Sequence, residues 1–221
     1  MSGAWSGHDW RIECGDCLEL LKTLPSGSVD CVVTDPPYGV GKAEWDSDFP
    51  LEWIKLAEYV APRMLTMPGN THLHTCIGAV SNYKDCIALF ALNGMTRSAI
   101  AFGNWIPVIA SGDWVWKARQ NLHPFVVDTS EQIDHPSPKP LSAMKWLIEK
   151  YTNPGDTILD PFAGSFTTGV ACLQTGRKFI GFELDRKYCE LGARRLADVA
   201  PLFRPPSEPQ KGAGLFAREE A

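Results

Sequence analysis

Two short segments carry residue types that could do chemistry: one suits a planar base with an amino group, and the other suits a nucleotide-like ligand. The first, Thr34–Gly39 (TDPPYG), follows the apolar run Val29–Thr34. Two consecutive prolines stiffen the backbone and cannot continue a sheet, so Tyr38 should project from the end of the strand. Asp35 and Pro36 would offer oxygen acceptors to N–H protons, and the Tyr38 ring would stack on the ligand. The alternative is a plain Pro-Pro turn with a surface tyrosine.

The second segment, Asp160–Gly169 (DPFAGSFTTG), lies between an apolar strand pattern and a helical one. A glycine turn at that place lets a ligand approach the backbone, and the helix N-terminus offers free N–H groups to an anion. The next strand pattern, Lys178–Phe182, ends in Glu183, where nucleotide sites carry the acid that binds a ribose hydroxyl. The alternative is an ordinary strand–turn–helix unit with a glycine for packing.

At these residues the sequence resembles the S-adenosylmethionine-dependent DNA amino-methyltransferases, which modify adenine N6 or cytosine N4. The catalytic motif precedes the cofactor motif, which is the permuted order of that family's beta group. Three further segments match the family: Gly15–Cys17 (GDC), His135–Pro140 (HPSPKP) and Asn153–Asp156 (NPGD). The resemblance is strong over residues 11–42 and 135–197.

The resemblance implies a role for each matching residue. The residues that would hold the target base are Asp35, Pro36, Pro37 and Tyr38. Those that would bind S-adenosylmethionine at its methionine end are Asp160, Phe162, Ala163, Gly164 and Ser165, with Lys139 and Thr167 or Thr168 at the carboxylate. Glu183 would bind the ribose and Asp16 the adenine amino group, with Cys17 and Leu184 beside them.

The expected reaction is methyl transfer to an exocyclic amino group of a base that has been flipped out of the duplex. Such a nitrogen is a poor nucleophile, so Asp35 and the Pro36 carbonyl would accept its hydrogens and position it. Carbon-5 cytosine methylation would require a nucleophilic cysteine, typically directly after a proline. No cysteine in this sequence follows a proline, which argues against that reaction. The resemblance favours adenine N6, because Asp35 heads the motif where the family's cytosine-N4 enzymes more often have a serine; cytosine N4 is the alternative. Methylation of RNA or of protein amides is disfavoured by the permuted order.

Phe166 departs from the family, which usually has glycine at this place. A Cβ and a ring would crowd the cofactor, or change the turn if φ is positive. A catalytically impaired relative that binds DNA or a partner is therefore a further hypothesis.

Alternating strand and helix patterns predict an α/β fold, a Rossmann-like, doubly wound and mostly parallel sheet with helices on both faces. The expected strands are Arg11–Cys14, Val29–Thr34, Thr71–Ile77, Thr96–Phe102, Asp113–Trp116, Thr157–Leu159 and Lys178–Phe182. The expected helices are Leu18–Leu24, Leu51–Leu65, Asn82–Leu92, Leu141–Tyr151, Thr167–Gln174 and Arg186–Val199.

The length of 221 residues, with 44% hydrophobic and 21% charged, is typical of a globular chain. We expect one methyltransferase domain at 1–200, small target-recognition loops at about 41–50 and 103–134, and a disordered tail at 201–221. Candidate DNA contacts are Lys42, Trp45, Lys117, Arg119 and Asn121. So compact a recognition region indicates a short site, relaxed specificity or a homodimer. Gln210 and Leu215-Phe216 in the tail weakly resemble sliding-clamp-binding peptides.

The net charge of −5 excludes bulk, histone-like binding of nucleic acid, but not DNA binding by one basic face. No apolar run reaches membrane-spanning length, no secretory signal opens the chain, and seven cysteines suit reduced thiols. These features predict an intracellular protein. The family resemblance implies the cytoplasm of a bacterial or phage-infected cell and a restriction-modification type of enzyme. His72, His74 and Cys76 would share one face of a strand, where packing is favoured over a metal site.

Overall fold

A computed structural model describes residues 3–37, 51–93, 96–97, 102–115, 121–127 and 138–199. Tyr38, Lys42, Trp45, Lys117, Arg119 and the tail at 201–221 lie outside the described residues, as does the first predicted recognition loop. The statements that follow concern the described part of the chain.

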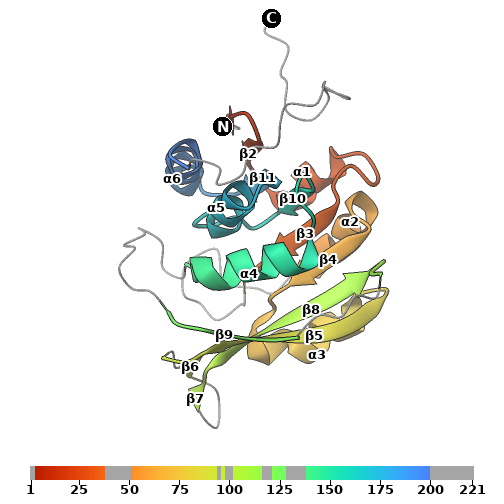
Figure 1. Cartoon of the computed structure of the whole chain (residues 1–221). Helices are drawn as coiled ribbons and strands as arrows, with labels where there is room; N and C mark the ends of the chain where they lie inside the picture. Colours follow the sequence, from red (N-terminus) through yellow and green to blue (C-terminus); the bar gives the residue numbers. More distant parts are fainter. Residues whose placement is uncertain are drawn as a thin grey trace, which may run out of the picture.

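Figure 1 shows the elements in chain order. The strands are β1 (Gly3–Ser6), β2 (Trp10–Cys14), β3 (Cys31–Thr34), β4 (Arg63–Thr66), β5 (Tyr83–Ala91), β6 (Thr96–Arg97), β7 (Phe102–Gly103), β8 (Trp105–Gly112), β9 (Leu122–Phe125), β10 (Thr157–Asp160) and β11 (Lys178–Glu183). The helices are α1 (Cys17–Lys22), α2 (Glu52–Val60), α3 (Gly69–Ala79), α4 (Leu141–Tyr151), α5 (Thr167–Gln174) and α6 (Arg186–Ala197).

Nine of these strands form one sheet in the order β1-β2-β11-β10-β3-β4-β8-β5-β9. The five from β2 to β4 are mutually parallel, while β8 pairs antiparallel with both β4 and β5. Every residue of β3 is buried, as expected for a strand that is covered on both faces. The predicted α/β fold with a mostly parallel sheet is confirmed.

Helices cover both faces of the sheet, and the sheet separates the hydrophobic core into two clusters (Figure 1). Helices α4, α5 and α6 bury their apolar residues on one face, together with Cys31 and Val33 of β3. Helices α1, α2 and α3 cover the other face, which receives Val32 of the same strand. Alternate residues of one strand thus serve opposite halves of the core.

Two predicted elements have the opposite type in the structure. The predicted strand Thr71–Ile77 is part of α3, so His74 is exposed while Cys76 is buried, and they do not share a face. Apolar residues at helical spacing signalled this helix: Leu73, Cys76, Ile77 and Val80. The predicted helix Asn82–Leu92 is strand β5, because it lies between β8 and β9 and buries alternate residues.

Two other predictions of secondary structure were wrong. The predicted helix Leu51–Leu65 ends at Val60, and β4 begins directly after Pro62, which cannot continue a helix. The predicted strand Asp113–Trp116 is not a strand over its described residues 113–115. Strand β8 takes up residues 105–112 of the segment 103–134 that the sequence assigned to target recognition.

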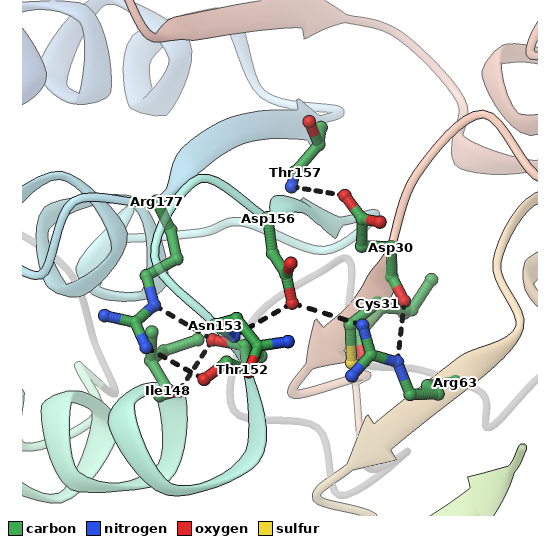
Figure 2. A network of polar contacts seen from close by, with 10 residues as sticks. Asp30, Cys31, Arg63, Ile148, Thr152, Asn153, Asp156, Thr157 and Arg177 are labelled. Atoms are coloured by element: carbon green, nitrogen blue, oxygen red, sulfur yellow. Dashed lines mark hydrogen bonds and ion pairs between the residues drawn. The ribbon is translucent and has the colours of Figure 1, made fainter. Parts of the chain in front are cut away.

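A polar network ties the strands together at their amino ends (Figure 2). The Asp156 carboxylate accepts from Arg63 at 3.1 Å and from the Asn153 N–H at 2.9 Å. The Asp30 carboxylate accepts from the Thr157 N–H at 2.8 Å. Buried Arg177 donates to both oxygens of Thr152, at 3.1 Å and 2.9 Å. The NPGD segment that resembles the family is therefore structural, and lies at the sheet edge opposite to the two chemical motifs.

No helix in the described ranges is long and apolar enough to cross a membrane. All seven cysteines are free thiols, and burial raises the pKa values of Cys31 and Cys76 to about 12. Within the described residues, no group of three or more His, Cys, Asp or Glu side chains is arranged to hold a metal ion.

Candidate functional site

The two predicted motifs meet at the carboxyl ends of neighbouring parallel strands. Asp160 ends β10, and Thr34 ends the adjacent β3. On the other side of β10, Glu183 ends β11, whose neighbour β2 leads into Gly15 and Asp16. After β10 the chain continues to β11 on one side, and after the neighbouring β3 it continues to β4 on the other side. Such a switch point is where open α/β sheets bind ligands.

Asp160 is buried at the centre of this edge, with 2% of its surface exposed. Its carboxylate accepts from the Thr34 and Thr168 hydroxyls, both at 2.7 Å, and from the Phe162 N–H at 3.1 Å. Burial raises the pKa of Asp160 to about 6, and the nearby charge of Asp35 adds to the rise. The site therefore holds a negative charge that a cation would stabilise.

The Thr34 hydroxyl is a contributor that the sequence analysis missed. It links the end of the catalytic motif's strand to the acid that opens the cofactor motif, 126 positions away. A hydroxyl residue closing a fully buried strand, directly before Asp35, is the signal that could have identified it.

Glu183 holds the glycine turn in place from the adjacent strand. Its carboxylate accepts from the Gly164 N–H at 2.9 Å and from the Asp185 N–H at 2.8 Å. Burial raises its pKa, which the two N–H donors partly counteract. Leu184 follows with 62% of its surface exposed, so an apolar side chain is presented to solvent next to the acid.

Asp16 is the N-cap of helix α1, so one of its two carboxylate oxygens is engaged by the helix. Its Oδ1 accepts from the Leu18 N–H at 2.7 Å and the Glu19 N–H at 3.4 Å. Cys17 begins the helix, and burial, with the charge of Asp16, raises its thiol pKa to about 12. Cys17 is therefore a protonated thiol at neutral pH and not a nucleophile.

Lys139 and Asp35 form an ion pair with each other. Lys139 stands just before α4, whose amino end thus lies beside the end of β3. Pro36 is buried and Pro37 half-buried after Asp35. Lys139, predicted to bind the carboxylate of the cofactor, therefore contacts Asp35, predicted to accept hydrogens from the target base.

The remaining predicted residues of the cofactor motif contact each other or the core. The Ser165 and Thr167 hydroxyls are 3.0 Å apart and buried. The Phe162 ring packs edge-on against Trp53 of α2, with 5.4 Å between centroids. Ala163 is buried, and its N–H donates to the Phe182 carbonyl at 2.9 Å. Of the predicted DNA contacts, only Asn121 is described; it is exposed, and its backbone carbonyl accepts from the Ala88 N–H.

Phe166 adopts the left-handed conformation, with φ 62° and ψ 24°, at the start of α5. This backbone costs a non-glycine residue about 1–2 kcal/mol, whereas full burial of a phenylalanine ring contributes about 1.5–3 kcal/mol. The ring is fully buried against Phe179, with 6.2 Å between centroids, in the core shared with α6. The ring therefore does not crowd the ligand edge, which was the reason to suspect impaired catalysis.

This edge can bind a ligand that carries both signs of charge. It brings together the carboxylates of Asp35, Asp160 and Glu183, of which two are buried enough to have raised pKa values. Lys139 supplies a positive charge beside them. The arrangement suits a ligand with cationic groups, one anionic group and hydroxyls, and the protonated Cys17 supplies no covalent route.

Residues 111–194 match a family model described as "DNA methylase". The DNA adenine methyltransferase YhdJ of Escherichia coli is 29% identical over 247 residues, covering 84% of this chain and 82% of that protein. The putative methylase YubD of Escherichia coli is 30% identical over 224 residues, covering 86% and 91%.

Solved structures are also similar to this chain. The complex of M1.HpyAVI with S-adenosylmethionine has a TM-score of 0.67 and 27% identity, covering 85% of this chain and 98% of that one. The cytosine-N4-specific PvuII DNA methyltransferase has a TM-score of 0.70 over 88% and 89%, with 19% identity, and shows the shared fold.

Proposed function

This chain belongs to the DNA methylase family of S-adenosylmethionine-dependent DNA methyltransferases, and we propose that the atom it methylates is N6 of adenine. Two features support adenine over cytosine. The acid Asp35, not a serine, heads the catalytic motif. The relative YhdJ, 29% identical, is named an adenine methyltransferase.

The cofactor is S-adenosylmethionine, which supplies a methyl group on a positively charged sulfur. We propose that its cationic methionine end lies beside Asp160, whose buried carboxylate is stabilised by a nearby positive charge. Its ribose hydroxyls would lie at Glu183, and the exposed Leu184 offers an apolar surface to its adenine ring. Lys139 would bind its carboxylate, with the hydroxyls of Thr167 and Thr168 close by.

In the proposed reaction, Asp35 and the Pro36 carbonyl accept the two hydrogens of the flipped-out amino group. This orients the nitrogen lone pair toward the methyl carbon, so that a C–N bond forms while the S–C electrons stay on sulfur. The nitrogen, now positively charged, then loses a proton along its hydrogen bond to the Asp35 carboxylate, which passes it to solvent. The observation that carries the proposal is that Asp35 follows β3, the strand next to β10, and so lies beside Asp160 at the same edge. Tyr38 is proposed to stack on the base.

The decisive experiment incubates the protein with tritiated S-adenosylmethionine and duplex DNA, digests the DNA, and identifies the modified nucleoside by mass spectrometry. N6-methyladenine is expected, and N4-methylcytosine as the sole product would overturn the choice of base. Asp35→Ala should lose methyl transfer by about a hundredfold or more while S-adenosylmethionine still binds. Retained transfer in that variant would contradict the role of Asp35.

The same proposal includes the cellular location of the enzyme, its oligomeric state and a contact with a partner protein. We propose that the enzyme acts in the bacterial cytoplasm, where DNA and the cofactor occur together. A homodimer would compensate for the compact recognition region and is tested by light scattering of the purified protein. A sliding-clamp contact through Gln210 and Leu215-Phe216 is tested by clamp binding with and without residues 201–221.

A further inference from the structure

We propose that Phe166 is a positioning residue for S-adenosylmethionine, because its buried ring anchors the turn that carries the cofactor motif. The inference rests on the cofactor placement beside Asp160 and Glu183 proposed above. It assigns to this ring, and to two glycines opposite it, the task of holding Gly164 and the start of α5 in their binding geometry.

The backbone at this place needs an anchor. Phe166 is the one non-glycine residue with positive φ among the described residues, and Gly164, two positions earlier, also has a positive φ of 49°. A glycine at 166 would reach this conformation at little cost but would reach many others as well. A phenylalanine remains there only if its side chain is held in place.

Two glycines from other elements, Gly192 and Gly181, leave the space that the Phe166 ring occupies. A Cβ on Gly192 of α6 would lie 2.5 Å from the Cγ of the Phe166 ring, nearer than real carbon contacts allow. A Cβ on Gly181 of β11 would lie 2.9 Å from its Cε1. The ring thus lies directly against the backbone of α6 and of β11, and even an alanine at 192 would displace it.

Helix α6 contacts the same turn at a second point. Arg195, one turn after Gly192, donates a hydrogen bond to the Ser165 carbonyl. Within the turn, the Phe166 N–H donates to the Ala163 carbonyl at 2.7 Å. The Phe166 carbonyl in turn accepts from the Val170 N–H at 3.0 Å, in the first turn of α5. Ring, turn and helix start are therefore one connected unit.

This unit carries the contacts that define the cofactor edge. The Gly164 N–H donates to Glu183, and the Thr168 hydroxyl donates to Asp160. If the ring shifts away from Gly192, both donors move with the backbone between them. Loss of the anchor should therefore weaken S-adenosylmethionine binding without touching the residues that would contact it.

The first test compares two alanine substitutions within helices. Gly192→Ala should weaken S-adenosylmethionine binding at least tenfold in isothermal titration calorimetry without DNA. The matched control is Gly78→Ala in α3, where a Cβ would meet nothing within 4 Å, and it should bind like the parent protein. Both are measured well below their thermal unfolding midpoints. Equal affinity in the two variants would overturn the inference.

The second test changes the ring itself. Phe166→Gly keeps the backbone conformation accessible but removes the anchor, so binding should weaken, and unchanged or tighter binding would overturn the inference. Phe166→Leu combined with Gly192→Ala gives the new methyl group room, so the double variant should recover part of the affinity lost in Gly192→Ala. In methylation assays the KM for S-adenosylmethionine should rise while the KM for DNA stays constant; a general structural defect would change both.

Glu183→Gln separates this inference from the cofactor placement on which it rests. If that variant binds S-adenosylmethionine normally, the placement itself is wrong. If it binds poorly while the Phe166 and Gly192 variants bind normally, only the anchoring role fails.

Discussion

The Lys139 ammonium contacts the Asp35 carboxylate, 104 positions away in the chain, and so joins the start of α4 to the end of β3. The family resemblance implies different ligands for these two side chains: the cofactor carboxylate for Lys139 and the target base for Asp35. As neighbours they can exchange partners: an anion that draws Lys139 away leaves Asp35 available to the hydrogens of an amino group. One ion pair therefore links the proposed cofactor site to the proposed base site.

Replacing Lys139 tests this link. Lys139→Met should raise the S-adenosylmethionine Kd by about tenfold or more, since a hydrogen bond to a charged group contributes about 1.5–3 kcal/mol. Calorimetry measures the effect, and Lys139→Arg, which keeps the charge, should recover part of the loss. Unchanged affinity in Lys139→Met would limit Lys139 to its contact with Asp35.

The pKa of Asp160 predicts how cofactor binding depends on pH. Below about pH 6 the Asp160 carboxylate is protonated, so S-adenosylmethionine affinity should fall by up to tenfold per pH unit. Thr34→Val removes a hydroxyl that lowers this pKa, and the midpoint should therefore move to higher pH. The matched control is Thr66→Val on the adjacent β4: Thr66 pairs with Thr34 in register and is equally buried. Its hydroxyl has no hydrogen-bond partner among the described residues, so its midpoint should not move.

Asp160→Asn should make the ligand-free protein more stable at neutral pH. The folded-state pKa of about 6 exceeds the reference value of 3.8, so the folded protein binds this proton more tightly than the unfolded chain. Stability from this group is thus present below about pH 4 and lost as pH rises through 6, at a cost of up to about 3 kcal/mol. Thermal unfolding should show an advantage of Asp160→Asn at pH 8 that shrinks toward pH 4. A variant less stable than the parent at pH 8 would contradict the burial argument.

Asp156→Ala should destabilise the fold without changing cofactor affinity. It removes one hydrogen-bond acceptor of the Arg63 guanidinium and the acceptor of the Asn153 N–H in the amino-end network, at a cost of about 2 kcal/mol. Denaturant unfolding measures the loss. Glu19→Ala, which removes an exposed ion pair with Lys22, is the control and should change stability by less than about 1 kcal/mol. A changed S-adenosylmethionine Kd in Asp156→Ala would contradict a purely structural role for this network.

Errors in the predicted elements have a common physical origin. In β5, the composition resembles a helix, but hydrogen bonding to β8 and β9 on its two sides decides its conformation. In α3, the β-branched and alternating residues favoured a strand, whereas burial of Leu73, Cys76 and Ile77 against one face of the sheet requires a helix. Short apolar runs do not distinguish the two structures until their neighbours are known.

The sequence by itself determined the α/β fold, the buried strands that lead to Thr34, Asp160 and Glu183, and the order of the two motifs. These features depend on local patterns: continuous apolar runs, turn residues and caps. The tertiary structure alone decided which side chains meet across the sheet. It paired Lys139 with Asp35 and Thr34 with Asp160, and it placed the Phe166 ring against Gly192 and away from the ligand edge. Such contacts depend on which strands and helices are neighbours, which no local pattern specifies.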